Sequence, residues 1–480
     1  MSTIRRIAKN TLTLALADLA NTIISFFFLM YVARYLGPKN FGVLSFALAF
    51  AAIFRVFTDI GLNQLTIREV ARNRSLTQKY LGNIIVLKLL LAMATFGLIA
   101  LTINFLGYPE ETANVVYLIA LAVVLNAFNL TFYSVFQAYE RMEFVSIGQI
   151  LNNVLLLAVA FYAIRQGSSV VTFAFAYLLA SILTLGFSAV VSSWKFARPK
   201  LEVDLFFWRE ALKQAMPFGL VILFSTVYYW VNSVMLSLMQ GDEPVGWYNA
   251  AYRLVISLQF IPVAYFNSVF PAMSRFSISS KESLKLVFER SVKYMLLLAI
   301  PLGVGTTLLA GNIVILIYGA EYYHSVIALQ ILIWSLVFIF INGVFAQLLN
   351  SLNKQSLVAK VTGACALLNI TLNHVLILRY GYIGASIATV STEFVALALL
   401  FLLGFRAGYG MSGRRLIALM VRIMVAVTIM GLFTFYFRSL TLWALVPFSA
   451  LLYFIALFIV KGIDREDKLL FWHIIRRREK

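Results

Sequence analysis

The sequence predicts an all-α polytopic membrane protein with about fourteen transmembrane helices, and three observations support this fold class. Hydrophobic residues make up 62% of the 480 residues, whereas charged residues make up only 12%. Apolar runs of about 20 residues, long enough to cross a bilayer as a helix, recur along the whole chain. These runs are continuous, whereas membrane β-strands would give shorter segments of alternating hydrophobicity.

The apolar runs define the predicted spans. In chain order they cover residues 11–33, 41–62, 81–106, 113–138, 145–164, 170–193, 214–239, 246–272, 291–317, 325–350, 357–378, 382–405, 416–437 and 442–460. The segment Leu36-Gly37-Pro38 separates the first two spans. It predicts a turn there, because glycine tolerates unusual backbone angles and proline cannot donate to a helical hydrogen-bond ladder.

A basic loop lies almost midway along the chain and divides the spans into six plus six, with two left over. Since six is even, both halves would enter the membrane in the same orientation, as parallel repeats do. The second span begins FGVLSFALAF and the eighth begins VGWYNAAYRL, each after a proline. The predicted organisation begins with an amino-terminal lobe (residues 1–193), a linker (194–213) and a carboxyl-terminal lobe (214–406). Two extra helices (407–461) and a basic amphipathic tail (462–480) follow.

Positive charge alternates between the loops and thereby predicts the topology. With the amino terminus inside, most lysines and arginines fall in inside segments, and the outside loops hold only Arg34, Lys39, Arg165, Arg379 and Arg438. Basic residues accumulate in cytoplasmic loops, so both termini are predicted to be cytoplasmic in a protein of the inner, cytoplasmic membrane. The net charge of +19 therefore reflects topology, and no nucleic-acid partner is predicted.

Two ionisable residues lie within the second span. Arg55 and Asp59 are four residues apart, which places them on one face of a helix. A charged residue within a membrane span costs about 2.5–3.5 kcal/mol on insertion scales, so it usually faces a cavity or a partner. This span is therefore a candidate wall of a polar pathway. In the alternative interpretation, Arg55 pairs with Asp59 or with Asp18 of the first span and only fixes helix packing.

Further charged residues lie within the predicted spans, and the cations of the two halves lie at different depths. Lys88 in the third span and Asp18 lie at an inner depth similar to that of Arg55, and Arg253 lies about 10 Å from the outer end of the eighth span. Arg34 at the outer end of the first span is another candidate contact, with snorkelling to the interface as the alternative. These cations would suit a diphosphate, because a guanidinium donates two parallel hydrogen bonds to phosphate oxygens.

Three acids inside the predicted spans are candidates for coupling to a proton or sodium gradient: Asp18, Asp59 and Glu393. Each is equally a candidate for a static counter-charge. No cofactor is predicted. His374 has no ligand partners at metal spacing, and the chain contains no phosphate-binding loop of the form G-x-x-x-x-G-K-[ST], which argues against ATP-driven transport.

The segment YLGPKNFGVLSFALAF, followed by FTDIGLNQLTIREVARN, resembles the amino-terminal pattern of polysaccharide biosynthesis flippases. These belong to the multidrug/oligosaccharidyl-lipid/polysaccharide superfamily. The match covers the first three spans, and the span layout extends it over the chain. The resemblance implies two six-helix lobes around a central cavity with alternating access, cavity arginines on early spans and on span eight, and a lipid-tail groove formed by the two extra spans. Arg55 and Arg253 fall on matching spans, although no strict motif aligns them.

The resemblance implies a flippase for a polyprenyl-diphosphate-linked oligosaccharide, embedded in membrane lipids, with a glycan polymerase or glycosyltransferase as candidate partners. A multidrug exporter of the same superfamily is one alternative; Arg55, Lys88 and Arg253 argue against cationic cargo, whereas the acids keep it open. A membrane glycan polymerase or ligase is the other alternative. The outer loops are short and their acids show no metal-binding spacing, so a transporter is predicted rather than an enzyme.

Overall fold

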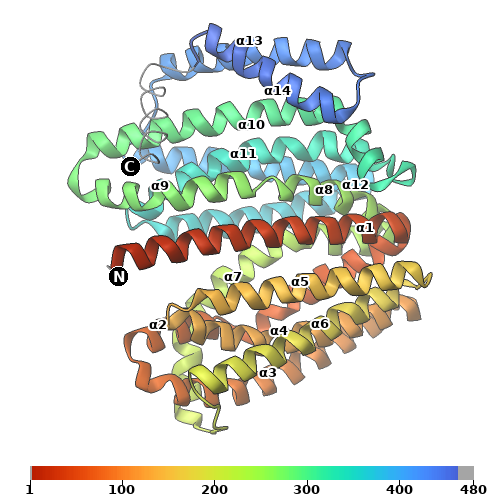
Figure 1. The fold of residues 1–480 in the computed structure, drawn as a ribbon, viewed down its shortest axis with the longest axis vertical. Coiled ribbons are helices and arrows are strands. Elements are labelled where there is room, and N and C mark those ends of the chain that lie inside the picture. The colour runs from red at the N-terminus through yellow and green to blue at the C-terminus, as the bar shows by residue number, and fades with distance from the viewer. Residues whose placement is uncertain (1–2, 463–480) are drawn as a thin grey trace. The chain divides into compact units, whose positions relative to one another are not determined.

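The computed structural model describes residues 3–462, with side chains from residue 20 onward, and it confirms the all-α fold class (Figure 1). The predicted tail beyond residue 462 lies outside the described residues. The α-helices are α1 (Thr3–Asp59), α2 (Leu62–Arg72), α3 (Thr77–Phe105), α4 (Glu110–Ala138), α5 (Met142–Arg165), α6 (Val170–Lys195), α7 (Leu205–Gln240), α8 (Asp242–Ser257), α9 (Phe260–Ser279), α10 (Lys281–Tyr318), α11 (Ser325–Ser351), α12 (Gln355–Arg406), α13 (Gly413–Tyr436) and α14 (Leu442–Ile459). Short 3-10 helices cover Arg74–Leu76 and Ala320–Tyr322.

Twelve helical stretches of the described residues are long and apolar enough to cross a membrane, so the chain is a multi-pass membrane protein. Two of these stretches, in α1 and α12, are broken where Gly37 has a φ of 69° and Gly381 a φ of 55°. Glycine adopts such angles without steric cost. Each broken helix corresponds to two predicted spans, and the turn at Gly37-Pro38 is confirmed. The number of crossings and the side of the termini stay predictions.

The helices group into two compact units, residues 1–253 with 362–388, and residues 254–361 with the described residues from 389 onward. In the first unit, α3, α4, α5 and α6 lie side by side, and α1 packs against α4 and α5 (Figure 1). In the second unit, α10 packs against α11 and α13, and α13 packs against α14. The division into two lobes of six spans stays a prediction.

The linker between α6 and α7 is fixed against the start of α3. Lys79 Nζ lies 3.3 Å from Asp204 Oδ2, and Asn83 Oδ1 accepts a hydrogen bond from the Asp204 backbone N–H at 3.0 Å. The backbone N–H of Phe207 donates to the Asp204 carboxylate; this bond, helped by Lys79, lowers the pKa of Asp204 from its usual value. Asp204 therefore caps α7 and holds the carboxyl end of the linker in place.

The starts of the second and eighth predicted spans meet at two glycines. A β-carbon on Gly42 of α1 would lie 1.8 Å from the carbonyl oxygen of Asp242, and one on Gly246 of α8 would lie 1.9 Å from that of Pro38. The contact is reciprocal, because each glycine lies four residues after the carbonyl that meets the other glycine. This reciprocity agrees with the internal similarity of the two segments.

Replacing Gly246 with alanine is expected to destabilise the protein by about 1–3 kcal/mol, because the added methyl group forces two backbones apart. Thermal unfolding of the purified protein in detergent measures this change. The matched control is Gly97→Ala in α3, where no heavy atom lies within 4 Å of the added β-carbon. It should be neutral or slightly stabilising, because alanine favours a helix over glycine. Equal behaviour of the two variants would contradict the close approach.

Candidate functional site

The carboxyl end of α1 turns sharply into α2. Ile60 and Gly61 adopt φ values of 46° and 86°. The turn packs tightly on α7, where a β-carbon on Gly61 would lie 2.5 Å from the carbonyl oxygen of Ala215. Asp59 Oδ1 accepts a hydrogen bond from the backbone N–H of Asn63 at 3.2 Å. The carboxylate thus sits at the amino-terminal end of α2, where unpaired N–H groups favour negative charge.

Lys88 of α3 is fully buried and neutralises this carboxylate. Its Nζ lies 2.7 Å from Asp59 Oδ1 and donates hydrogen bonds to Asn63 Oδ1 at 2.8 Å and to the carbonyl oxygen of Ala127 at 3.2 Å. These three acceptors match the three N–H donors of an ammonium group. Among the described side chains, Asp59 therefore forms its ion pair with Lys88, and not with Arg55 as in the alternative interpretation of the sequence. Lys88 does not line the neighbouring pocket itself, but all three of its acceptor residues, Asp59, Asn63 and Ala127, do.

Arg55 lines a pocket of about 210 Å³ beside this ion pair. Among the described residues, the polar side chains of the lining come from α1, α2 and α4 and include Arg55, Asp59, Asn63, Gln64, Ser134 and Gln137. Within the same part of the chain, the Arg55 guanidinium makes no ion pair and no hydrogen bond. The pocket therefore offers the donors of one arginine, surrounded by amide and hydroxyl groups.

The charges around this pocket do not cancel. Arg55 and Lys88 supply two positive charges, and Asp59 supplies one negative charge among the described side chains. Because the Lys88–Asp59 pair is buried, it is screened less by salt than a surface pair would be. Among the described side chains the balance is one net positive charge, and a charge in such surroundings attracts an anion more strongly than it would in water.

Arg253 lies in different surroundings of the same compact unit. Its guanidinium is 5.3 Å from the ring centroid of Trp230, a cation–π distance. Tyr229 packs against both Trp230 and Tyr252, with centroid separations of 5.0 Å and 5.7 Å. Arg253 does not line the Arg55 pocket, so the structure places the two predicted arginines in separate sites, one polar and one aromatic.

The remaining predicted site residues are dispersed. Arg34 is exposed on α1, just before the break at Gly37. Glu393 is buried in the second unit, where its Oε2 accepts a hydrogen bond from Asn342 at 2.8 Å. Asp18 lies outside the described side chains. Substrate contact by Arg34 and ion coupling by the three acids stay predictions.

Reasoning from the sequence missed the contributions of α2 and α4 to the pocket. It concentrated on charged residues within spans, whereas Gln64, Ser134 and Gln137 are uncharged. One signal was available: Ser134 and Gln137 lie three residues apart and so share a helix face. The pairing of Lys88 with Asp59 was not predicted, because the two residues lie on different spans and far apart along the chain.

The family model described as "Polysaccharide biosynthesis protein" matches residues 7–277, more than half of the chain, and a model described as "MatE" matches residues 217–375. A protein of Haloferax volcanii named as a low-salt glycan biosynthesis flippase is 23% identical over 388 residues, covering 80% of each chain. A protein of Shigella dysenteriae named as an O-antigen transporter is 25% identical over 405 residues, covering 82% of this chain and 98% of its own.

Solved structures show the same fold. The lipid II flippase MurJ in an inward closed conformation has a TM-score of 0.78 at 17% identity and covers 95% of this chain and 100% of its own. An inward-facing multidrug resistance MATE transporter has a TM-score of 0.64 at 16% identity, covering 81% and 94%. With this fold, and with a family model that matches more than half of its length, the chain belongs to the polysaccharide biosynthesis protein family, as the resemblance of its amino-terminal segment implied.

Proposed function

We propose that this protein moves a lipid-linked oligosaccharide from the cytoplasmic to the outer leaflet of the cytoplasmic membrane. The observation that carries the proposal is the Arg55 pocket, where a guanidinium without an ionic partner among the described side chains meets amide and hydroxyl groups. The names of the two relatives, a glycan biosynthesis flippase and an O-antigen transporter, support this cargo class. They also agree with the prediction of a transporter rather than an enzyme.

The chemistry of the pocket fits a sugar diphosphate. Arginine binds phosphate oxygens through two parallel N–H bonds, and it keeps its charge at any physiological pH. The side-chain amides of Asn63, Gln64 and Gln137 both donate and accept hydrogen bonds, as the hydroxyl groups of a sugar require. Because Lys88 already neutralises Asp59, the pocket favours an anionic head group over a cationic drug.

Arg253 provides a second cation in this proposal. The flat aromatic faces beside it, Trp230 and Tyr229, offer surfaces on which a sugar ring can stack, while the guanidinium meets the diphosphate. The head group would contact the two arginines at different stages of the alternating-access cycle that the family resemblance implies. Arg34, at the end of the first span, would contact the head group near one membrane surface.

The driving force is also part of the proposal. A proton or sodium gradient would act through Asp18, Asp59 or Glu393, or consumption of the product outside would draw the cargo across. Asp59 is paired with Lys88, which links coupling through Asp59 to the geometry beside Arg55. A glycan polymerase or a glycosyltransferase is the proposed partner that consumes or supplies the cargo.

Transport by the reconstituted protein tests the proposal. Proteoliposomes containing the purified full chain should move a fluorescent polyprenyl-diphosphate-linked saccharide between leaflets faster than protein-free vesicles. A cationic dye should not accumulate in the same vesicles. The MatE match makes the opposite result meaningful, since dye transport without saccharide transport would identify a multidrug exporter and contradict the proposal.

A further inference from the structure

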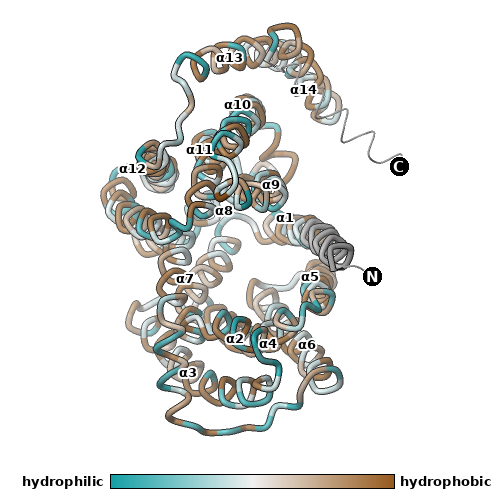
Figure 2. Tube along the Cα trace, turned by 90° about the vertical axis from the view of Figure 1, so that its left-hand side faces the viewer, coloured by the Kyte–Doolittle hydropathy of each residue, from teal (hydrophilic) through white to brown (hydrophobic). Residues whose placement is uncertain are grey.

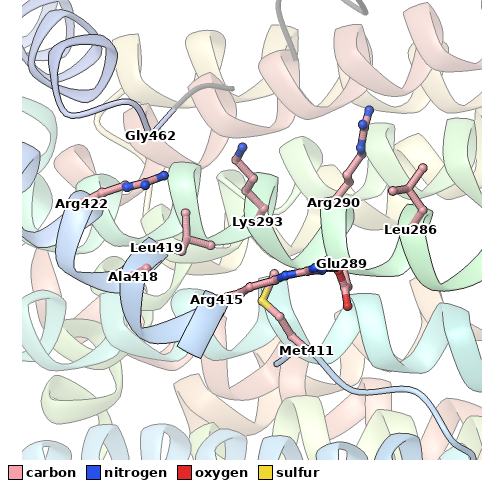
Figure 3. A pocket seen from close by; sticks show the side chains of 10 residues that line it. All are labelled: Leu286, Glu289, Arg290, Lys293, Met411, Arg415, Ala418, Leu419, Arg422 and Gly462. Atoms are coloured by element: carbon pink, nitrogen blue, oxygen red, sulfur yellow. Dashed lines mark hydrogen bonds and ion pairs between the residues drawn. The ribbon is translucent and has the colours of Figure 1, made fainter. Parts of the chain in front are cut away.

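The second compact unit contains a charged cavity that the proposed transport pathway does not use (Figure 3). It has a volume of about 350 Å³ and lies between α10 and α13. Among the described residues, four basic side chains and one acid line it: Glu289, Arg290, Lys293, Arg415 and Arg422. The lining follows an i, i+3, i+4, i+7 pattern on both helices, starting at Leu286 and at Arg415, so each helix presents one face to the cavity.

Two of the arginines are oriented by the protein. Arg415 Nη1 lies 3.2 Å from Glu289 Oε2, and Arg422 Nη1 donates a hydrogen bond to the carbonyl oxygen of Lys461 at 2.9 Å. A guanidinium has five N–H donors, so one such contact orients the group and leaves other donors for a ligand. Figure 3 shows Lys293 and Arg290 pointing the same way from α10, with Arg422 reaching toward Lys293.

The exposed face of α13 is apolar, which indicates that the cavity lies beside a helix in contact with membrane lipid. Ile417 and Val421 are 66% and 57% exposed, and they lie on the side of α13 away from Arg415 and Arg422. Figure 2 shows α13 as predominantly hydrophobic, with hydrophilic residues where the helix begins. An exposed apolar face on a membrane-spanning helix contacts acyl chains, and a basic residue in its first turn, such as Arg415, favours the depth of the lipid head groups.

We propose that this cavity binds the phosphate group of a membrane lipid with a net negative charge. Guanidinium forks bind phosphate oxygens in pairs and the lysine adds a point charge, and basic pockets between membrane helices bind lipid phosphates in this way. Two lipids share this chemistry, an anionic phospholipid and a polyprenyl diphosphate. Only binding of a polyprenyl diphosphate rests on the proposed transport function. The binding measurement below does not require transport, so a failure of this lipid site is distinguishable from a failure of the proposed transport function.

Native mass spectrometry of the full-length protein in detergent tests the site. The probes are phosphatidylglycerol, a polyprenyl diphosphate, phosphatidylcholine and inorganic diphosphate. The double variant R415Q/R422Q should bind the anionic lipids at least about tenfold more weakly than wild type. The matched control R406Q/R414Q removes the same charge from exposed arginines outside the cavity and should bind as wild type does. Glu289→Gln, which removes the acid of the lining, should tighten binding, so the test does not depend on one variant.

The outcomes separate the two lipid sources. Preference for phosphatidylglycerol identifies a resident phospholipid, and preference for polyprenyl diphosphate identifies the cargo; either supports the proposal. Equal losses in the two double variants, equal binding of phosphatidylcholine, or binding of inorganic diphosphate alone would overturn it. Three acids follow Gly462 in the sequence: Asp464, Glu466 and Asp467. If anionic lipid bound only after these acids were neutralised, the proposal would also be overturned, because the ligand of the cavity would then be the chain's own tail.

Discussion

Replacing Arg55 with alanine is expected to lower the rate of saccharide transport by about 10- to 100-fold. A hydrogen bond to a charged group contributes about 1.5–3 kcal/mol, and removing the guanidinium removes such bonds to the diphosphate. Lysine at this position keeps the charge but not the planar fork, so Arg55→Lys should fall between alanine and wild type. The effect should be large because no other arginine among the described residues lines this pocket.

The proteoliposome assay with a labelled polyprenyl-diphosphate-linked saccharide measures these rates. Arg165→Ala is the matched control, because Arg165 is exposed at the end of α5 and lies outside the pocket. Its transport rate should equal that of wild type. If Arg55→Ala transported at the same rate as this control, Arg55 would be a packing residue and the pocket would not be the cargo site.

Replacing Lys88 with methionine is expected to destabilise the protein by about 3–5 kcal/mol, because Asp59 would remain in a largely buried position without its counter-charge. The double variant D59N/K88M should recover most of this loss. It removes both charges together, and replacing a whole buried pair with neutral residues is often nearly neutral. The free energy of unfolding in detergent, measured for both single variants and the double variant, gives the coupling between the two side chains.

The matched control for this prediction is Lys79→Met. Lys79 also pairs with an aspartate, Asp204, but its side chain is 48% exposed. An exposed pair contributes about 0–1 kcal/mol, so this variant should lose little stability. Similar losses in Lys79→Met and Lys88→Met, or a double variant D59N/K88M no more stable than Lys88→Met alone, would show that the buried pair is not coupled as described.

The fold was largely predictable from the sequence, because a long apolar run indicates a membrane helix and an interruption of the run indicates where that helix ends. The break at Gly37-Pro38 followed from the properties of two residues, and the structure confirms it. The helix α2 was not predicted as an element. It is short and polar, and it begins after Ile60, a β-branched residue at a φ of 46° that no propensity would suggest.

The candidate site was only partly predictable. The sequence placed Arg55 and Lys88 at similar depth and Asp59 on the same helix face as Arg55, but depth does not determine the direction in which a side chain points. Lys88 points from α3 toward Asp59, and this contact decides which cation faces the pocket. Arg253 was predicted as a cavity residue, but its contact with Trp230 was not predicted. That contact depends on packing between α7 and α8, which the spacing of residues along one helix does not indicate.

We propose that Lys88 serves to neutralise Asp59, so that Arg55 remains available to an anionic cargo. The transport rate of D59N/K88M tests it most directly. The predicted result is a rate close to that of wild type, which falls by about 10- to 100-fold when Arg55→Ala is added. A folded double variant that transports no saccharide would contradict the claim, because the charges of Asp59 and Lys88 would then act on the cargo or on its driving ion themselves.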